Sequence, residues 1–242
     1  MTNRWTIWGG IAAVAAVGSF FLVPQVKGWA RGEIETVIHQ YIVENPEVIP
    51  EAMTRLEERR MAQMIGVVRE DLERPFEGAW SGATDPQVTV VQFFDYACGY
   101  CRASLPDLNR LVEENDDVRI VYRELPILSP ESEQAARVSL SAARQREYMD
   151  FHLAMYAAGR PSNATIAQAQ REAGLDAAQV TSDMNAENVV GELRNNLDLA
   201  RRLELTGTPA FIIGDRILSG AVGYERLRQA VQEVRDAPRS GD

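Results

Sequence analysis

The chain contains two cysteines, Cys98 and Cys101, which form a Cys-x-x-Cys pair just after the apolar run Val88–Phe94. Two cysteines at this spacing, between a strand and a helix, are typical of a reversible disulfide. Only a thiolate is a good nucleophile, so the pair needs a neighbourhood that stabilises negative charge. The first chemistry to consider is therefore thiol–disulfide exchange.

Three other interpretations of the pair are weaker. A zinc site needs four ligands, but there is no second cysteine pair, and His39 and His152 form no close His-x-His motif, so zinc would require sharing between subunits. A purely structural disulfide would close a very short loop and add little stability. Paired thiolates suit Cu(I), but one pair without a flanking methionine cluster is poor support for a copper-binding or copper-protection protein. We therefore predict no metal site.

Composition excludes several partners. The chain has 242 residues, is 45% hydrophobic and carries a formal net charge of -10. This length suffices for one good core and a smaller appendage. The acidic balance argues against nucleic acid and against anionic lipid as partners.

The N-terminus predicts export. Residues 1–30 resemble a signal peptide, with an uncharged apolar stretch from Trp5 to Val23 and small residues at Gly28 and Ala30 for cleavage. The stretch is almost long enough for a membrane anchor, which remains the alternative. We expect a periplasmic chain, where a disulfide can persist.

Residues 31–74 are predicted to form a helical arm, broken at Asn45-Pro46, and the breaker-rich residues 75–86 are predicted to form a linker. The arm cannot bury its apolar stripe alone. It must pack on the main domain or on copies of itself, so a homo-oligomer through residues 31–74 is one of two open alternatives.

Residues 87–236 have the pattern of an α/β domain, followed by a polar tail at 237–242. The Cys98 helix connects two strands by a parallel crossover. The predicted elements are a strand at 87–96, a helix from Cys98 to about Asn115, a strand at 118–125, a helical insertion at about 130–204, hairpin strands at 210–213 and 216–219, and a helix at 224–234.

This order of elements resembles a thioredoxin fold with a helical insertion, as in the DsbA family. Residues 93–102, which contain the cysteine pair, and Pro106 in the following helix are similar to the family's active-site segment. Residues 207–213 (GTPAFII) resemble its cis-proline segment, and residues 42–49 resemble the N-terminal helical region of ScsC-type proteins. Together these matches cover nearly all of the predicted mature chain.

At the N-terminus of its helix, Cys98 is predicted to be the attacking sulfur, because the backbone N–H groups of Tyr100 and Cys101 and the helix dipole favour its thiolate. Cys101, one turn further in, would resolve the mixed disulfide. Gly99 leaves the loop open. Tyr100 lacks the imidazole that strongly oxidising relatives carry at this position, which predicts a less acidic Cys98 and a weaker oxidant.

By resemblance, Thr208 and Pro209 form the other half of the site. In thioredoxin-like folds this proline follows a cis bond and faces the disulfide, and the backbone before it pairs with the substrate chain. Without the cysteines, Gly-Thr-Pro before a strand would indicate only a turn.

Other polar residues have less defined roles. Gln92 occupies the position, six residues before the first cysteine, where thioredoxins carry a buried acid. Asp95 could manage protons or be a solvated loop residue, and Glu124 is a second weak candidate for proton transfer. We expect His152 to be a packing residue of the insertion, and His39 has no evident role.

The combined prediction is an exported thiol–disulfide oxidoreductase that acts on cysteine-containing proteins without an organic cofactor, with Cys98-Cys101 as its redox-active disulfide. Isomerase or reductase activity is favoured, and a DsbA-like dithiol oxidase is the alternative within this class. A membrane redox partner would reduce or oxidise the pair.

Overall fold

The computed structural model describes residues 32–237, so the predicted signal peptide and nearly all of the predicted tail lie outside the described residues. The chain divides into two compact units, whose described parts are residues 32–57 and 58–237. Within this range no helix is both long enough and apolar enough to cross a membrane.

The first unit consists of a helix at residues 32–44 and the start of helix α2 (Val48–Glu73). The break predicted at Asn45 is present, and the Asn45 amide donates to the carbonyl of Tyr41 at 2.9 Å. The large apolar side chains of this unit are exposed: Ile34, Val37, Ile38, Tyr41, Val43, Ile49, Met53 and Leu56. The unit therefore buries little apolar surface within itself.

The second unit contains a five-stranded sheet with the strand order β1-β3-β2-β4-β5. β2 and β3 are parallel neighbours, and the other three pairs are antiparallel. The strands are β1 (Trp80–Gly82), β2 (Val88–Phe94), β3 (Val118–Glu124), β4 (Ala210–Ile213) and β5 (Arg216–Ser219).

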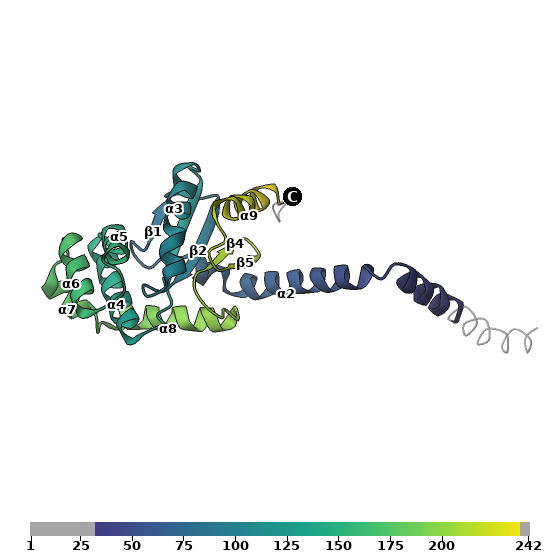
Figure 1. The fold of residues 1–242 in the computed structure, drawn as a ribbon, viewed down its shortest axis with the longest axis horizontal. Coiled ribbons are helices and arrows are strands. Elements are labelled where there is room, and N and C mark those ends of the chain that lie inside the picture. The colour runs from purple at the N-terminus through teal and green to yellow at the C-terminus, as the bar shows by residue number, and fades with distance from the viewer. Residues whose placement is uncertain (1–31, 238–242) are drawn as a thin grey trace, which may run out of the picture. The chain divides into compact units, whose positions relative to one another are not determined.

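Helices cover both faces of this sheet, and α3 and α9 pack together on one of them (Figure 1). The predicted insertion consists of five helices, α4 to α8. The helices that follow α2 are α3 (Gly99–Glu113), α4 (Pro130–Gln145), α5 (Tyr148–Ala158), α6 (Asn163–Glu172), α7 (Ala177–Asp183), α8 (Glu187–Arg202) and α9 (Tyr224–Asp236).

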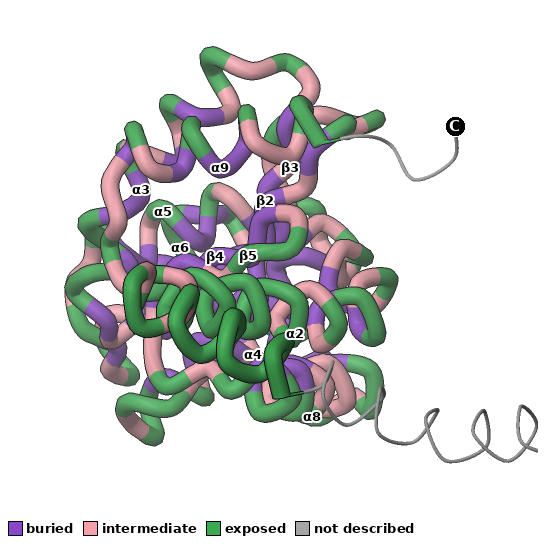
Figure 2. Tube along the Cα trace, turned by 90° about the vertical axis from the view of Figure 1, so that its right-hand side faces the viewer, coloured by how far each residue is buried: buried purple, intermediate pink, exposed green. Residues whose placement is uncertain are grey.

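Strand β2 is buried on both faces, as its nearly continuous apolar sequence predicts (Figure 2). Alternate residues enter different cores. Val90 and Phe94 join the larger core, which also contains both cysteines and side chains of α3, α5 and α9. Val91 and Phe93 join a smaller core with side chains of α2 and α8.

The second unit departs from the sequence expectation before β2. The segment 75–86, predicted as a linker, contains edge strand β1, which pairs with β3. The C-terminal half of α2 belongs to the second unit, where Ile65, Val68 and Leu72 are core residues. A strand of three residues has too little periodicity to detect, and the apolar stripe of α2 does not show where its partner changes.

The boundary between α4 and α5 was also not predicted. Helix α4 ends because Arg146 adopts a left-handed conformation with φ of 67°, and its N–H caps the carbonyls of Ala142 and Ala143. Glycine is the usual residue in this conformation. A non-glycine cap therefore gives the sequence no recognisable stop signal.

Arg123 of β3 joins three elements on the smaller-core face. Arg123 is 2% exposed, and its guanidinium donates to the carbonyls of Asp71 and Leu72 at the end of α2 and of Arg74 just after it. It also donates to Glu192 at 2.6 Å and Asn196 at 2.9 Å, both on α8. The charge is therefore buried with several acceptors around it.

We expect Arg123→Met to lower the free energy of unfolding by about 3 to 5 kcal/mol, because it leaves a largely buried carboxylate and helix-end carbonyls without their donor. Urea unfolding followed by circular dichroism measures the change. Arg201→Met, which removes an exposed ion pair with Asp198 on α8, should cost less than about 1 kcal/mol. Equal losses in the two variants would contradict the role assigned to Arg123.

Candidate active site

The cysteine pair lies at the carboxyl end of β2, where the chain turns into α3. Cys98 is the N-cap of α3, with φ of -83° and ψ of 114°, and its sulfur accepts the N–H of Cys101 at 3.3 Å. An N-cap position is normally held by an oxygen acceptor. The Cys98 sulfur is thus placed where the helix end favours negative charge. Of the two predicted N–H donors, the structure provides the one from Cys101.

The second contact of Cys98 comes from the segment before β4. Its thiol donates to the backbone oxygen of Thr208 at 3.3 Å. The Thr208–Pro209 peptide bond is cis, as the resemblance predicts. The structure therefore brings Cys98 next to the Thr208–Pro209 segment, which lies more than 100 residues further along the chain.

Cys101 differs from Cys98 in its surroundings. Both are free thiols, but Cys98 is 6% exposed whereas Cys101 is 0% exposed. Burial raises the pKa of the Cys101 thiol well above its usual range, and the Asp95 backbone and the Thr208 hydroxyl partly offset this effect. Cys101 is therefore kept neutral and away from solvent in the reduced pair.

The two residues between the cysteines face outward. Tyr100 is 71% exposed, and a Cβ added to Gly99 would meet no heavy atom within 4 Å. The space beside Gly207 is equally open. An extended peptide can therefore approach both sides of the cysteine pair without displacing side chains.

Asp95 is not the solvated loop residue that was one of the two sequence expectations. It is 2% exposed, and its carboxylate accepts the N–H groups of Ala97 at 2.7 Å and of Ile127 and Leu128 at 2.9 Å. Its carbonyl accepts the N–H of Cys98 at 3.0 Å. Asp95 thus fixes the loop after β3 beside the active-site turn, a role that depends on donors more than 30 residues away.

Glu124, the last residue of β3, lies beside Phe94 in the parallel pair. It is 1% exposed, and its Oε1 accepts hydrogen bonds from Ser139 at 2.9 Å and Tyr148 at 3.1 Å. Its Oε2 has no partner among the described residues. Burial raises the pKa of Glu124 to about 7.

His152 packs in the core, as expected, and its ring contacts those of Phe94, Tyr122 and Tyr156. Burial lowers its pKa to about 3, so the imidazole is neutral at physiological pH. Gln92 is also buried. His39 is exposed on the first unit, away from these residues in the sequence.

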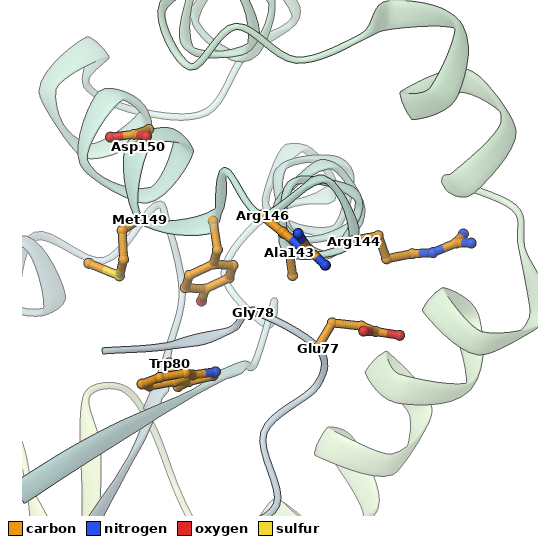
Figure 3. Close-up of a pocket in the computed structure, with 9 residues that line it drawn as sticks. Glu77, Gly78, Trp80, Ala143, Arg144, Arg146, Met149 and Asp150 are labelled. Atoms are coloured by element: carbon orange, nitrogen blue, oxygen red, sulfur yellow. The ribbon is translucent and has the colours of Figure 1, made fainter. Parts of the chain in front are cut away.

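A pocket of about 550 Å³ opens beside β1 and the junction of α4 with α5 (Figure 3). Trp80, Arg144 and Arg146 line it together with Tyr148, but neither cysteine does. Between residues 32 and 237 no cluster of three or more His, Cys, Asp or Glu side chains could hold a metal ion.

Comparison with known proteins agrees with this geometry. Residues 89–232 match the family described as DSBA-like thioredoxin domain, and residues 31–63 match the ScsC N-terminal domain of copper resistance proteins. The first match covers more than half of the chain and includes nearly all of β2, strands β3 to β5, the cysteine pair and the insertion.

Two solved structures are similar to the second unit. A thioredoxin-like oxidoreductase from Silicibacter pomeroyi is 39% identical, with a TM-score of 0.63 over 66% of this chain and 92% of that chain. The catalytic domain of Proteus mirabilis ScsC is 30% identical, with a TM-score of 0.65 over 72% of this chain and 97% of that chain.

A curated relative, the Na(+)/H(+) antiporter NhaA 3 of Salinispora tropica, is 28% identical over 63% of this chain. The chain spans only about a quarter of that relative's length, 24%. The shared region is therefore one part of a longer protein.

The predicted thioredoxin fold with a helical insertion is thus confirmed. The chain belongs to the family of DSBA-like thioredoxin domain proteins, and the residues before this domain match the ScsC N-terminal domain.

Proposed function

We propose that this chain is a thiol–disulfide oxidoreductase that reduces and rearranges disulfides in exported proteins, with Cys98 as the attacking sulfur and Cys101 as the resolving one. The observation that carries the proposal is the asymmetry of the pair. The Cys98 sulfur caps α3 and Cys98 is 6% exposed, next to the exposed Gly99 and Tyr100, whereas Cys101 is fully buried. A substrate disulfide therefore meets Cys98 first.

The proposed thiol–disulfide exchange needs no organic cofactor. The Cys98 thiolate attacks one sulfur of a substrate disulfide, which breaks, releases one substrate thiolate and leaves a mixed disulfide. In isomerisation, another substrate thiolate attacks this mixed disulfide and restores the Cys98 thiolate. In reduction, Cys101 loses its proton and attacks instead, which leaves a Cys98–Cys101 disulfide for a membrane dithiol partner to reduce.

The surface beside Cys98 suits an unfolded client. Tyr100, Ile127 and Leu128 are large, exposed apolar side chains, and the Asp95 carboxylate holds the backbone of the last two next to the active-site turn. Partly unfolded proteins expose apolar segments near their cysteines. These three side chains would hold such a segment through apolar contacts with little sequence preference.

The first unit is proposed to join several chains. Its apolar side chains are exposed, and residues 31–63 match the ScsC N-terminal domain. A second copy of the same helical unit is the proposed partner for this surface. An oligomer would place several cysteine pairs around one client, which raises the local concentration of catalytic thiols.

Cys98→Ser should abolish the repair of scrambled substrate, because it removes the attacking sulfur. Cys101→Ser should retain single attack but accumulate mixed disulfide, since no internal thiol resolves it. Gel analysis under non-reducing conditions and a scrambled ribonuclease assay measure both effects. Reduction of substrate disulfides by Cys101→Ser at the wild-type rate, without accumulated mixed disulfide, would contradict the resolving role. Tight Cu(I) binding without thiol exchange in the wild type would favour the copper alternative.

Thr208→Val should slow the release of mixed disulfide roughly tenfold, because it removes a hydroxyl that favours the Cys101 thiolate. The folded state should not suffer, since Thr208 Oγ1 is buried without a normal hydrogen bond in the described chain. Rapid-quench kinetics and urea unfolding separate the two effects. Thr165→Val, far from the cysteines in the sequence, removes the hydroxyl that completes the α6 capping box and should lower stability without changing the release rate.

Light scattering on the mature chain should give a mass of two or more chains, and a chain that begins at Glu58 should give a monomer. The truncation leaves Ile65, Val68 and Leu72 in place, so the second unit keeps its core. Within the mature chain, Ile38→Asp should also yield smaller species, because it places a charge on the apolar surface. A monomeric mass for the mature wild type would contradict the oligomer.

A further inference from the structure

A chain of buried hydrogen bonds connects Glu124 to the active-site turn. Ser139 of α4 donates to Glu124 at 2.9 Å, and the Ser139 oxygen lies 2.9 Å from the Tyr96 hydroxyl. The Tyr96 hydroxyl in turn lies 3.1 Å from Nδ1 of His152. All four side chains are at most 1% exposed. Four polar groups from four segments therefore share one water-excluded site.

The direction of these hydrogen bonds follows from the charge on Glu124. An ionised carboxylate can only accept, so Ser139 must donate to it, and Tyr96 must then donate to Ser139. The remaining contact requires the proton of neutral His152 on Nδ1. Nε2 of His152 is then an acceptor, and it has no partner among the described residues. When Glu124 binds a proton, this fixed order is no longer imposed.

The chain ends close to the reacting sulfurs. Tyr96 precedes Cys98 by two residues, in the turn between β2 and α3. Its ring lies 5.1 Å from that of Tyr156, whose hydroxyl donates to the Asp95 carbonyl. Burial raises the pKa of Tyr156, and the charges of Cys101 and Cys98 raise it further. Tyr96 and Tyr156 thus connect the Glu124 cluster to the segment that carries Cys98.

Tyr148 connects Glu124 to a pocket. It donates to Glu124 and lines the pocket shown in Figure 3. Of the nine residues around this pocket, Tyr148 is the one that hydrogen-bonds to Glu124. Neither cysteine lines the pocket, so this contact of Glu124 lies apart from the cysteine pair.

The charged and titratable groups around the Glu124 carboxyl come from each element that packs near it. They are Tyr96 of the active-site turn, Tyr122 and Arg123 of β3, Tyr148 and His152 of α5, and Glu192 of α8. Arg123 is committed to Glu192 and the end of α2 on the other face. No cation therefore neutralises Glu124 on its own face within the described residues.

We propose that Glu124 is a positioning residue for thiol–disulfide exchange, which acts through the hydroxyl groups of Ser139 and Tyr96 on the turn that carries the attacking sulfur. Loss of its proton fixes the direction of these hydrogen bonds, and through them the hydroxyl groups carry the effect of the buried negative charge to the turn, where it disfavours the Cys98 thiolate. The raised pKa of Glu124, about 7, places this change near physiological pH. The inference rests on the proposed role of Cys98.

The test is the pH profile of Cys98 alkylation by iodoacetamide in reduced Cys101→Ser protein, with and without Glu124→Gln. With Glu124 present, the profile should show a second inflection near pH 7, because ionisation of the carboxyl weakens the thiolate. Glu124→Gln should remove this inflection and react roughly threefold faster at pH 8. Glu192→Gln, another largely buried carboxyl but on the opposite face, is the matched control and should keep the inflection.

Tyr96→Phe separates the hydrogen-bond route from simple proximity. It keeps the ring but removes the hydroxyl, so the second inflection in Cys98 reactivity should be lost. Glu124 should still titrate. The free energy of unfolding should still fall as the pH rises from 4.5, the ordinary pKa of the carboxyl, to about 7. A retained inflection in Tyr96→Phe would overturn the route through Tyr96.

If Glu124→Gln does not fold, the wild-type protein provides the decisive measurement. Its oxidised-minus-reduced infrared spectrum should contain a protonated-carboxyl band that disappears between pH 6 and 8 and shifts in Ser139→Ala. Unchanged profiles in Glu124→Gln, or no carboxyl band at any pH, would overturn the inference while leaving thiol exchange intact. A Cys98 thiol that does not react at any pH would instead overturn the proposed function.

Discussion

The active site depends on the way two buried carboxyl groups are satisfied at the carboxyl end of the β2–β3 pair. Asp95 follows β2 and Glu124 ends β3, in neighbouring positions of a parallel ladder that is covered on both faces. Neither group can rely on water, so each must find donors within the protein. Asp95 finds them in the backbone of its own turn and of the next loop, and Glu124 finds them in hydroxyl groups of α4 and α5. These bonds fix the turn that carries Cys98.

The two carboxyl groups, Asp95 and Glu124, differ because their hydrogen-bond donors differ. Three backbone N–H groups surround the Asp95 carboxylate. Glu124 has two hydroxyl donors and one oxygen without a partner in the described part of the chain, and burial raises its pKa to about 7. Backbone amides cannot change direction, whereas hydroxyl groups can donate or accept. Fixed backbone donors at Asp95 and hydroxyl groups at Glu124 that can reorient therefore hold the same turn.

Sequence patterns predicted the elements that have enough residues to show a period. The doubly buried β2 and β3, the cysteine helix, the β4–β5 hairpin and α9 are all of this kind, and the cysteine spacing located the site. The patterns could not show that Arg123 and Glu124, two adjacent charged residues, are both buried. Alternation along β3 sends them to opposite faces, but only helices far along the chain provide their partners. The same limit applies to Asp95, and the three residues of β1 were too few to recognise.

Arg123 and Glu124 also explain how strand β3 contributes to polar clusters on both faces of the sheet. Arg123 binds the end of α2, the helix that continues from the first unit, whereas Glu124 faces the cysteine turn on the other side of the sheet. A peptide bond joins the two residues, and β3 is hydrogen-bonded on both edges, to β1 and β2. Such a strand cannot slide without breaking both polar clusters. The end of α2 and the turn that carries Cys98 are therefore held by one rigid element, which fixes the cysteine pair relative to the last turns of α2.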